Sequence, residues 1–165
     1  MKVLAWIGVL VLASCASINP TQVDLTHFAT LAPNEEPLYA TDFTLLDLNG
    51  EAHQLSQQQG SWVVINFWQT TCAPCVEEMP ALQAIDERYN NLEVWAINIR
   101  ETPDQIRAFM QAHQLTLTVL LGSDQVSLDY TVMALPQTVV VAPNGEIVYR
   151  QFGALQLETF IKLLG

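Results

Sequence analysis

The sequence predicts an α/β fold in which a central mixed β-sheet is flanked by helices and preceded by an N-terminal β-hairpin. Residues 63–68 and 94–99 are almost continuously apolar, which is typical of central strands covered on both faces. A helical pattern lies between these two strands, and a second hairpin and a further helical pattern follow them, which is the element order of a sheet-and-helix sandwich. The segment 39–165 is long enough for one compact domain.

The hairpin and the central strand come first along this domain. Residues 43–48 and 51–55 flank Asn49-Gly50, a pair that favours a type I′ turn between antiparallel strands. After the strand at 63–68, apolar residues recur at helical spacing from Cys75 to Tyr89. We therefore expect a hairpin, a central strand and then a helix.

A second helix follows the buried strand at 94–99. Residues 102–105 combine an N-cap threonine, a proline at the first helical position and a glutamine three residues after the cap, a pattern that marks a helix start. We expect its inner face to hold Ile106, Phe109, Met110 and His113, with His113 packing at the helix end.

The remaining expected elements are short. They are a strand at 117–121, one or two helical turns at 125–130, a second hairpin built from 138–141 and 146–151, and a closing amphipathic helix over 157–164.

Two cysteines separated by two residues follow the central strand directly. Cys72 is expected at the start of a helix, where unpaired N–H groups and the positive end of the helix dipole stabilise a thiolate. Cys72 is therefore the candidate nucleophile. Cys75, one turn into the helix, is placed to attack the mixed disulfide that Cys72 forms with a partner. Such a redox-active disulfide needs no further cofactor.

Two other uses of this cysteine pair are a metal site and a structural disulfide. A closed zinc site needs four ligands, but the chain has no second pair of this spacing, and His27, His53 and His113 are scattered along it. We therefore predict no metal. A purely structural disulfide is the second alternative, although so short a loop gains little from loop closure.

The N-terminus has the layout of an export signal. Lys2 precedes an apolar run over 3–12 that is shorter than the ~20 residues needed to span a bilayer. The Leu-Ala-Ser-Cys ending at Cys15 resembles the lipobox of bacterial lipoproteins, in which the cysteine is acylated. We expect a signal peptide over 1–14, lipidation at Cys15 and a linker over 15–38; ordinary cleavage beside a free Cys15 is the alternative.

Composition and export limit the class of partner. Six Lys and Arg residues stand against 17 Asp and Glu residues, for a formal net charge of −11, so a nucleic-acid partner is not expected. Attachment to a membrane would have to come from the lipid rather than from charge. Export places the dithiol in the cell envelope, facing the periplasm, where disulfides persist. Ala16 after the cysteine resembles the outer-membrane sorting pattern rather than the inner-membrane one.

Five short motifs carry a family resemblance over residues 43–164. They are Asn66-Phe67-Trp68, Cys72-Ala73-Pro74-Cys75, Glu78-Met79-Pro80, Ala134-Leu135-Pro136-Gln137-Thr138, and residues 144–148 followed by Gly153. With them the chain resembles the thioredoxin-fold thiol-disulfide oxidoreductases of the TlpA/ResA type, membrane-tethered reductases often linked to cytochrome c maturation.

The resemblance implies roles for residues around the dithiol. Pro136 is the implied cis-proline facing the disulfide, and the Leu135 backbone is free to pair with a substrate segment as an added strand. Glu78 is either a proton acceptor for Cys75 or an exposed helix carboxylate. Candidate substrate contacts are Trp68, Thr71, Ala73, Pro74 and Leu135. The implied partners are protein thiols and disulfides and a membrane electron donor.

Some positions depart from the family pattern. Asn66 stands where thioredoxins proper have a buried aspartate, Thr71 replaces the usual tryptophan, and Gln137 interrupts the common Pro-Thr-Thr. These changes keep the dithiol but leave its potential open, since 30 mV corresponds to only ~1.4 kcal/mol.

The function expected is that of a lipid-anchored reductase of protein disulfides. Two alternatives use the same fold or the same thiols. A peroxiredoxin-like peroxidase needs a threonine three residues before its cysteine, where this chain has Gln69. A Cu(I) chaperone would use the paired thiolates, usually with an added histidine or methionine.

Overall fold

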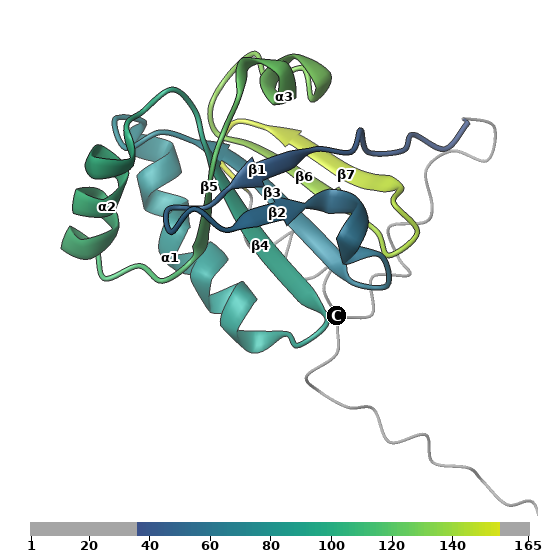
Figure 1. The fold of residues 1–165 in the computed structure, drawn as a ribbon, viewed down its shortest axis with the longest axis horizontal. Helices are drawn as coiled ribbons and strands as arrows, with labels where there is room; N and C mark the ends of the chain where they lie inside the picture. Colours follow the sequence, from purple (N-terminus) through teal and green to yellow (C-terminus); the bar gives the residue numbers. More distant parts are fainter. Residues whose placement is uncertain (1–35, 156–165) are drawn as a thin grey trace, which may run out of the picture.

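The computed structural model describes residues 36–155, which form a five-stranded mixed sheet with helices and a hairpin packed on it (Figure 1). The elements in chain order are β1 (Thr44–Leu46), β2 (Ala52–Gln54), the 3₁₀ helix η2 (Leu55–Gln58), β3 (Trp62–Trp68), α1 (Ala73–Arg88), β4 (Leu92–Asn98), α2 (Pro103–Ala112), β5 (Thr118–Leu121), α3 (Asp124–Asp129), β6 (Gln137–Val141) and β7 (Ile147–Phe152). The expected signal peptide, Cys15, nearly all of the linker and the helix over 157–164 lie outside the described residues.

Strand β3 is the centre of the sheet, whose order is β5-β4-β3-β6-β7. It pairs in parallel with β4, where Val64 lies opposite Val94, and antiparallel with β6, where Val64 lies opposite Val140. Strand β5 adds in parallel beyond β4, and β7 adds antiparallel beyond β6. The predicted mixed sheet with an N-terminal hairpin is therefore confirmed.

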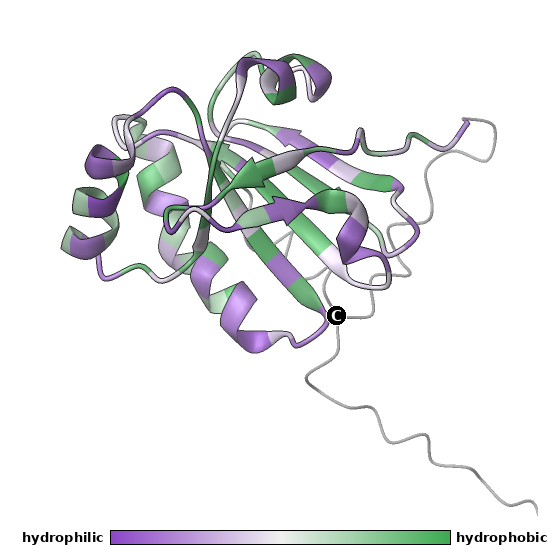
Figure 2. Ribbon diagram, viewed as in Figure 1, coloured by the Kyte–Doolittle hydropathy of each residue, from purple (hydrophilic) through white to green (hydrophobic). Residues whose placement is uncertain are grey.

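Alternate residues of β3 serve two separate apolar clusters, one on each face of the sheet. Val64 and Trp68 pack in the cluster that contains the buried side of α1, whereas Ile65 and Phe67 pack in the cluster that contains the hairpin. Figure 1 shows the β1–β2 hairpin in front of the sheet and α1 behind it, and the strands between them are largely hydrophobic in Figure 2. Burial on both faces explains why residues 63–68 are almost continuously apolar.

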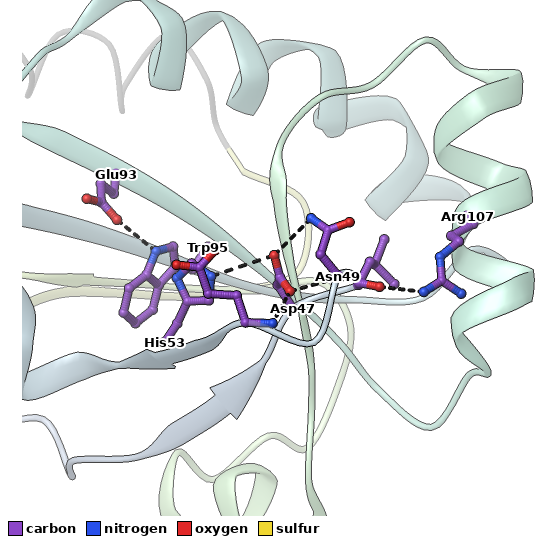
Figure 3. A network of polar contacts seen from close by, with 8 residues as sticks. Asp47, Asn49, His53, Glu93, Trp95 and Arg107 are labelled. Carbon is purple, nitrogen blue, oxygen red and sulfur yellow. Dashed lines mark hydrogen bonds and ion pairs between the residues drawn. The ribbon is translucent and has the colours of Figure 1, made fainter.

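The hairpin exists, but its turn differs from the predicted one. A type I′ turn needs positive φ at both central residues, and of Asn49 and Gly50 only Gly50 has it, at 86°. Leu46 pairs with Ala52, and the Asp47 carboxylate accepts the N–H groups of Asn49 and Glu51, each at 2.8 Å (Figure 3). The type I′ prediction is therefore wrong, because an aspartate closes a longer loop.

The predicted start of α2 is confirmed, whereas the prediction that His113 belongs to its inner face is wrong. Thr102 and Gln105 form the expected capping box, and Pro103 is the first helical residue. Ile106 and Met110 are buried. His113 is the C-cap and is exposed, with its ring 4.2 Å from that of Phe109 between centroids. His113 therefore covers Phe109 from outside and does not enter the core.

Within residues 36–155 no helix has both the length and the apolar character needed to cross a bilayer.

Candidate active site at the dithiol

Cys72 and Cys75 form a disulfide at the junction of β3 and α1, with an S–S distance of 2.08 Å and Cα atoms 5.3 Å apart. Strand β3 ends at Trp68, a turn follows, and Cys72 is the N-cap of α1. Cys72 is half-buried, whereas Cys75 is 0% exposed and packs in the apolar cluster beneath α1. The helix start thus presents one sulfur towards solvent and keeps the other in the core.

The turn before Cys72 is tied to the segment that follows β4. The Cys72 N–H donates to the Gln69 carbonyl at 3.2 Å, and the Gln69 side chain donates to the Ile99 carbonyl at 2.8 Å. The N–H and the hydroxyl of Thr70 both donate to the Glu101 carboxylate, at 2.8 and 2.6 Å. Sequence reasoning missed Glu101. The available signal was its place just after β4, because the carboxyl ends of neighbouring parallel strands meet at one edge of a sheet.

Beneath the dithiol, a buried carboxylate enters the apolar cluster. Glu78 is 8% exposed, and its two oxygens accept hydrogen bonds from the Asn66 side chain and the Leu155 N–H, both at 2.7 Å. The Asn66 amide also donates to the Thr138 hydroxyl at 3.1 Å. Burial raises the pKa of Glu78, and these two hydrogen bonds oppose the rise. The alternative that Glu78 is an exposed helix carboxylate is wrong.

The Leu135-Pro136 peptide bond is cis, as the resemblance implied. Pro136 is buried, and its carbonyl accepts the Gly153 N–H at 2.8 Å. Gln137, fully buried at the start of β6, donates to the Tyr130 carbonyl at 2.9 Å. These bonds fix the segment that leads into β6.

A surface pocket connects this segment to the turn before the dithiol. It has a volume of about 180 Å³ and is lined by Gln69, Ile99, Arg100, Ser127 and residues 132–135. Met133, at its side, is 78% exposed. Leu135 and the turn before Cys72 therefore border one depression.

The candidate substrate contacts divide into exposed and buried residues. Thr71, Ala73 and Pro74 are exposed around Cys72, and Leu135 is half-buried. Trp68 is 0% exposed and its ring lies 5.2 Å from that of Phe109 between centroids. The prediction that Trp68 contacts substrate is therefore wrong for its side chain, which lies on the helix-covered face of β3 and supports the site from below.

One group of side chains has donors close enough to hold a metal ion within residues 36–155. Atoms of Asp47, Glu51 and His53 lie within 4.8 Å of one another in the hairpin (Figure 3). The Asp47 carboxylate is already engaged by N–H groups of its own loop, and the His53 ring packs edge-on against Trp95 at 5.8 Å. This group closes the hairpin and holds it on the sheet, and we assign it no metal.

Comparisons with known proteins agree with this geometry. Residues 39–150 match the AhpC/TSA family. The chain is 36% identical over 117 residues to the thioredoxin-like protein YneN of Bacillus subtilis, which covers 68% of this chain and 69% of that protein. It is 37% identical over 111 residues to the thiol-disulfide oxidoreductase ResA of Geobacillus kaustophilus, which covers 66% of this chain and 64% of ResA, slightly less than two thirds.

A solved structure gives the same fold. A putative thiol:disulfide interchange protein DsbE from Chlorobium tepidum superposes with a TM-score of 0.70 at 24% identity, covering 79% of this chain and 99% of that one. The fold and the family resemblance predicted from the motifs are both confirmed.

The difference in exposure between the two sulfurs predicts their reactivity once reduced. Cys72 should be alkylated faster than Cys75, with a pKa below the ~8.5 of a free thiol, because only Cys72 lies at the helix start and reaches solvent. Below both pKa values, each unit of difference gives about a tenfold difference in thiolate fraction, and a lower pKa makes the thiolate somewhat less nucleophilic, so the rate ratio from the pKa is about threefold per unit. Peptide mass spectrometry after limiting iodoacetamide measures this, and preferential labelling of Cys75 would contradict it.

Proposed function

The chain belongs to the AhpC/TSA family and to its ResA-type thiol-disulfide oxidoreductases, and we propose that it reduces protein disulfides in the cell envelope while tethered through Cys15. The observation that carries this proposal is the pairing of a half-buried sulfur at a helix start with a fully buried sulfur one turn later. This arrangement lets an outer thiol meet a protein and an inner thiol release it.

The reaction proceeds by two exchanges of sulfur partners. The Cys72 thiolate attacks a substrate disulfide, forms a mixed disulfide with one substrate sulfur and releases the other as a thiolate. The Cys75 thiolate then attacks the Cys72 sulfur, which forms the Cys72–Cys75 disulfide and releases the second substrate sulfur. Two electrons pass to the substrate, so a membrane electron donor must restore the dithiol.

Substrate approach is expected at the exposed side of Cys72. Thr71, Ala73 and Pro74 surround this sulfur, and the Leu135 backbone offers a place where an extended segment can add as a strand. The resemblance to reductases linked to cytochrome c maturation makes the disulfides of that process the first substrates to test.

Glu78 supplies the proton acceptor for the inner thiol in this scheme. It lies three residues after Cys75 on α1, a spacing that places two side chains next to each other on a helix. Its raised pKa brings the carboxylate closer to the pKa of a thiol, which favours proton transfer between them.

Replacing Glu78 by glutamine should slow the second exchange, because an amide cannot accept the proton. We expect the disulfide-reduction rate at pH 7 to fall by tenfold or more, in line with the ~10²-fold or larger effect of general bases. The rise of the wild-type rate as pH increases through the Glu78 pKa should also disappear. Glu77→Gln, on the exposed side of the same helix, is the control; equal pH profiles for wild type and Glu78→Gln would exclude the role.

The Cys75→Ser variant tests the proposed function itself. It should capture substrate proteins as mixed disulfides on Cys72, because the attacking thiol remains and the releasing one is gone. Non-reducing gels with mass spectrometry identify the captured proteins. The Cys72→Ser/Cys75→Ser double variant should lose these species, and identical patterns in the two variants would show that no exchange substrate was captured.

The Cys15→Ser variant tests the tether. A single acyl chain binds a bilayer only marginally, whereas the two or three chains of a processed lipoprotein hold it stably. Cys15→Ser should therefore move the domain to the soluble envelope fraction or leave a precursor of higher mass. Unchanged fractionation together with unchanged intact mass would remove the lipoprotein proposal.

A further inference from the structure

We propose that Glu101 is a positioning residue that shifts the dithiol towards the reducing side, by holding a negative charge on the turn that leads into Cys72. The inference rests on the proposed function only in taking Cys72 and Cys75 as the pair that is oxidised and reduced in turn. The Glu101 carboxylate accepts its hydrogen bonds from Thr70 and Asn98, and Glu101 lies outside the five motifs that carry the family resemblance.

Three hydrogen bonds converge on this carboxylate. One oxygen accepts the Thr70 hydroxyl at 2.6 Å, and the other accepts the Thr70 N–H at 2.8 Å and the Asn98 side-chain amide at 2.7 Å. Glu101 thereby joins the turn after β3 to the end of β4. Thr70 lies only two residues before the half-buried Cys72, so the charge is held on the turn that leads into Cys72.

The backbone on both sides of Glu101 is fixed independently. Arg100 has a φ of 63°, a left-handed conformation that is uncommon for a residue with a side chain. Thr102, on the other side, caps α2. Two further bonds across the same corner, from Gln69 to Ile99 and from the Ile99 N–H to the Trp68 carbonyl, keep the two segments in register.

The third partner, Asn98, is equally constrained. Asn98 is 2% exposed, and its carbonyl accepts the Gly122 N–H at 2.9 Å. A Cβ at Gly122 would lie 2.6 Å from that carbonyl oxygen, so only glycine fits against it. The Asn98 residue that donates to the Glu101 carboxylate is therefore itself held in place by its backbone contacts.

Within residues 36–155 the Glu101 carboxylate forms no ion pair with an Arg or His side chain. The nearby Arg100 guanidinium pairs with Asp124 at 3.0 Å instead. A negative charge held on the turn before Cys72 disfavours the Cys72 thiolate, and so disfavours the reduced pair relative to the disulfide at a pH where that thiolate is populated. Glu101 therefore orders the turn before Cys72 and also makes the Cys72–Cys75 dithiol a stronger reductant.

The test removes the charge and keeps the shape. Glu101→Gln retains an oxygen that can accept from Thr70 or Asn98, so the turn is expected to stay in place. We expect the Cys72 peptide to be alkylated about threefold to tenfold faster at a pH below its pKa. At a pH above the Cys72 pKa, where the reduced pair carries the thiolate, the equilibrium with glutathione should shift towards the dithiol by a similar factor, which is ~15–30 mV for a two-electron couple.

Three further variants separate charge from other causes. Glu101→Ala also removes the charge, and should shift the equilibrium in the same direction even if Glu101→Gln folds poorly. Glu87→Gln removes a carboxylate near the far end of α1 and should change neither quantity. Thr70→Val keeps the charge while removing one hydrogen bond, and no shift towards the dithiol is expected.

Two results would overturn the proposal. One is an equilibrium constant and an alkylation rate within twofold of wild type in both Glu101 variants. The other is an equal shift in Thr70→Val, which would mean that order in the turn, and not charge, sets the equilibrium. Both readouts use the purified chain and glutathione, so they are independent of whether Cys75→Ser captures substrate proteins.

Discussion

The burial of β3 on both faces is the constraint on which the rest of the structure depends. Because β4 and β6 flank this strand and apolar clusters cover both of its sides, its end at Trp68 is fixed in space. The turn and α1 start from that fixed point. The position of Cys72 therefore follows from the most protected strand of the domain, although the sulfur itself reaches the surface.

Two carboxylates are held near the junction of β3 and α1, one on α1 and one after β4. Glu78 comes up from the buried face of α1, with Asn66 on β3 as a hydrogen-bond donor. Glu101 approaches from the segment after β4 and holds the turn before Cys72. Burying a charged group without partners is costly, and each carboxylate here is held by hydrogen bonds from the backbone or from amide or hydroxyl groups.

The sequence predicted those features correctly that depend on residues close together in the chain. The buried strands at 63–68 and 94–99 and the capping box at Thr102 depend on neighbouring residues, and all are present. The cis bond at Pro136 was expected from the resemblance alone. The turn at Asn49-Gly50 was wrong because the Asp47 side chain takes up the N–H groups of the loop.

The features that the sequence did not predict depend on contacts between residues far apart in the chain. Trp68 belongs to the helix-covered face of β3 and meets Phe109 of α2, a contact that no local pattern reveals. Glu101 was missed because its partner Thr70 lies 31 positions earlier, and only the pairing of β3 with β4 brings them together. The fold class and the position of the cysteine pair after β3 could therefore be predicted, whereas the polar surroundings of the dithiol required the three-dimensional structure.

Residues 38–40 determine at which end of the sheet the chain enters the domain. They run beside the β6–β7 turn, where Tyr39 bridges Glu146 and the Ala40 N–H donates to the Gly145 carbonyl at 2.9 Å. This turn follows Val141, which lies opposite Val63 near the beginning of β3, while the dithiol follows the end of β3. Seven strand residues separate the two ends, roughly 20 Å at ~3.3 Å per residue. The N-terminal end of the described domain and the disulfide therefore lie at opposite ends of β3, so a partner that contacts Cys72 approaches the domain away from the point where the chain enters it.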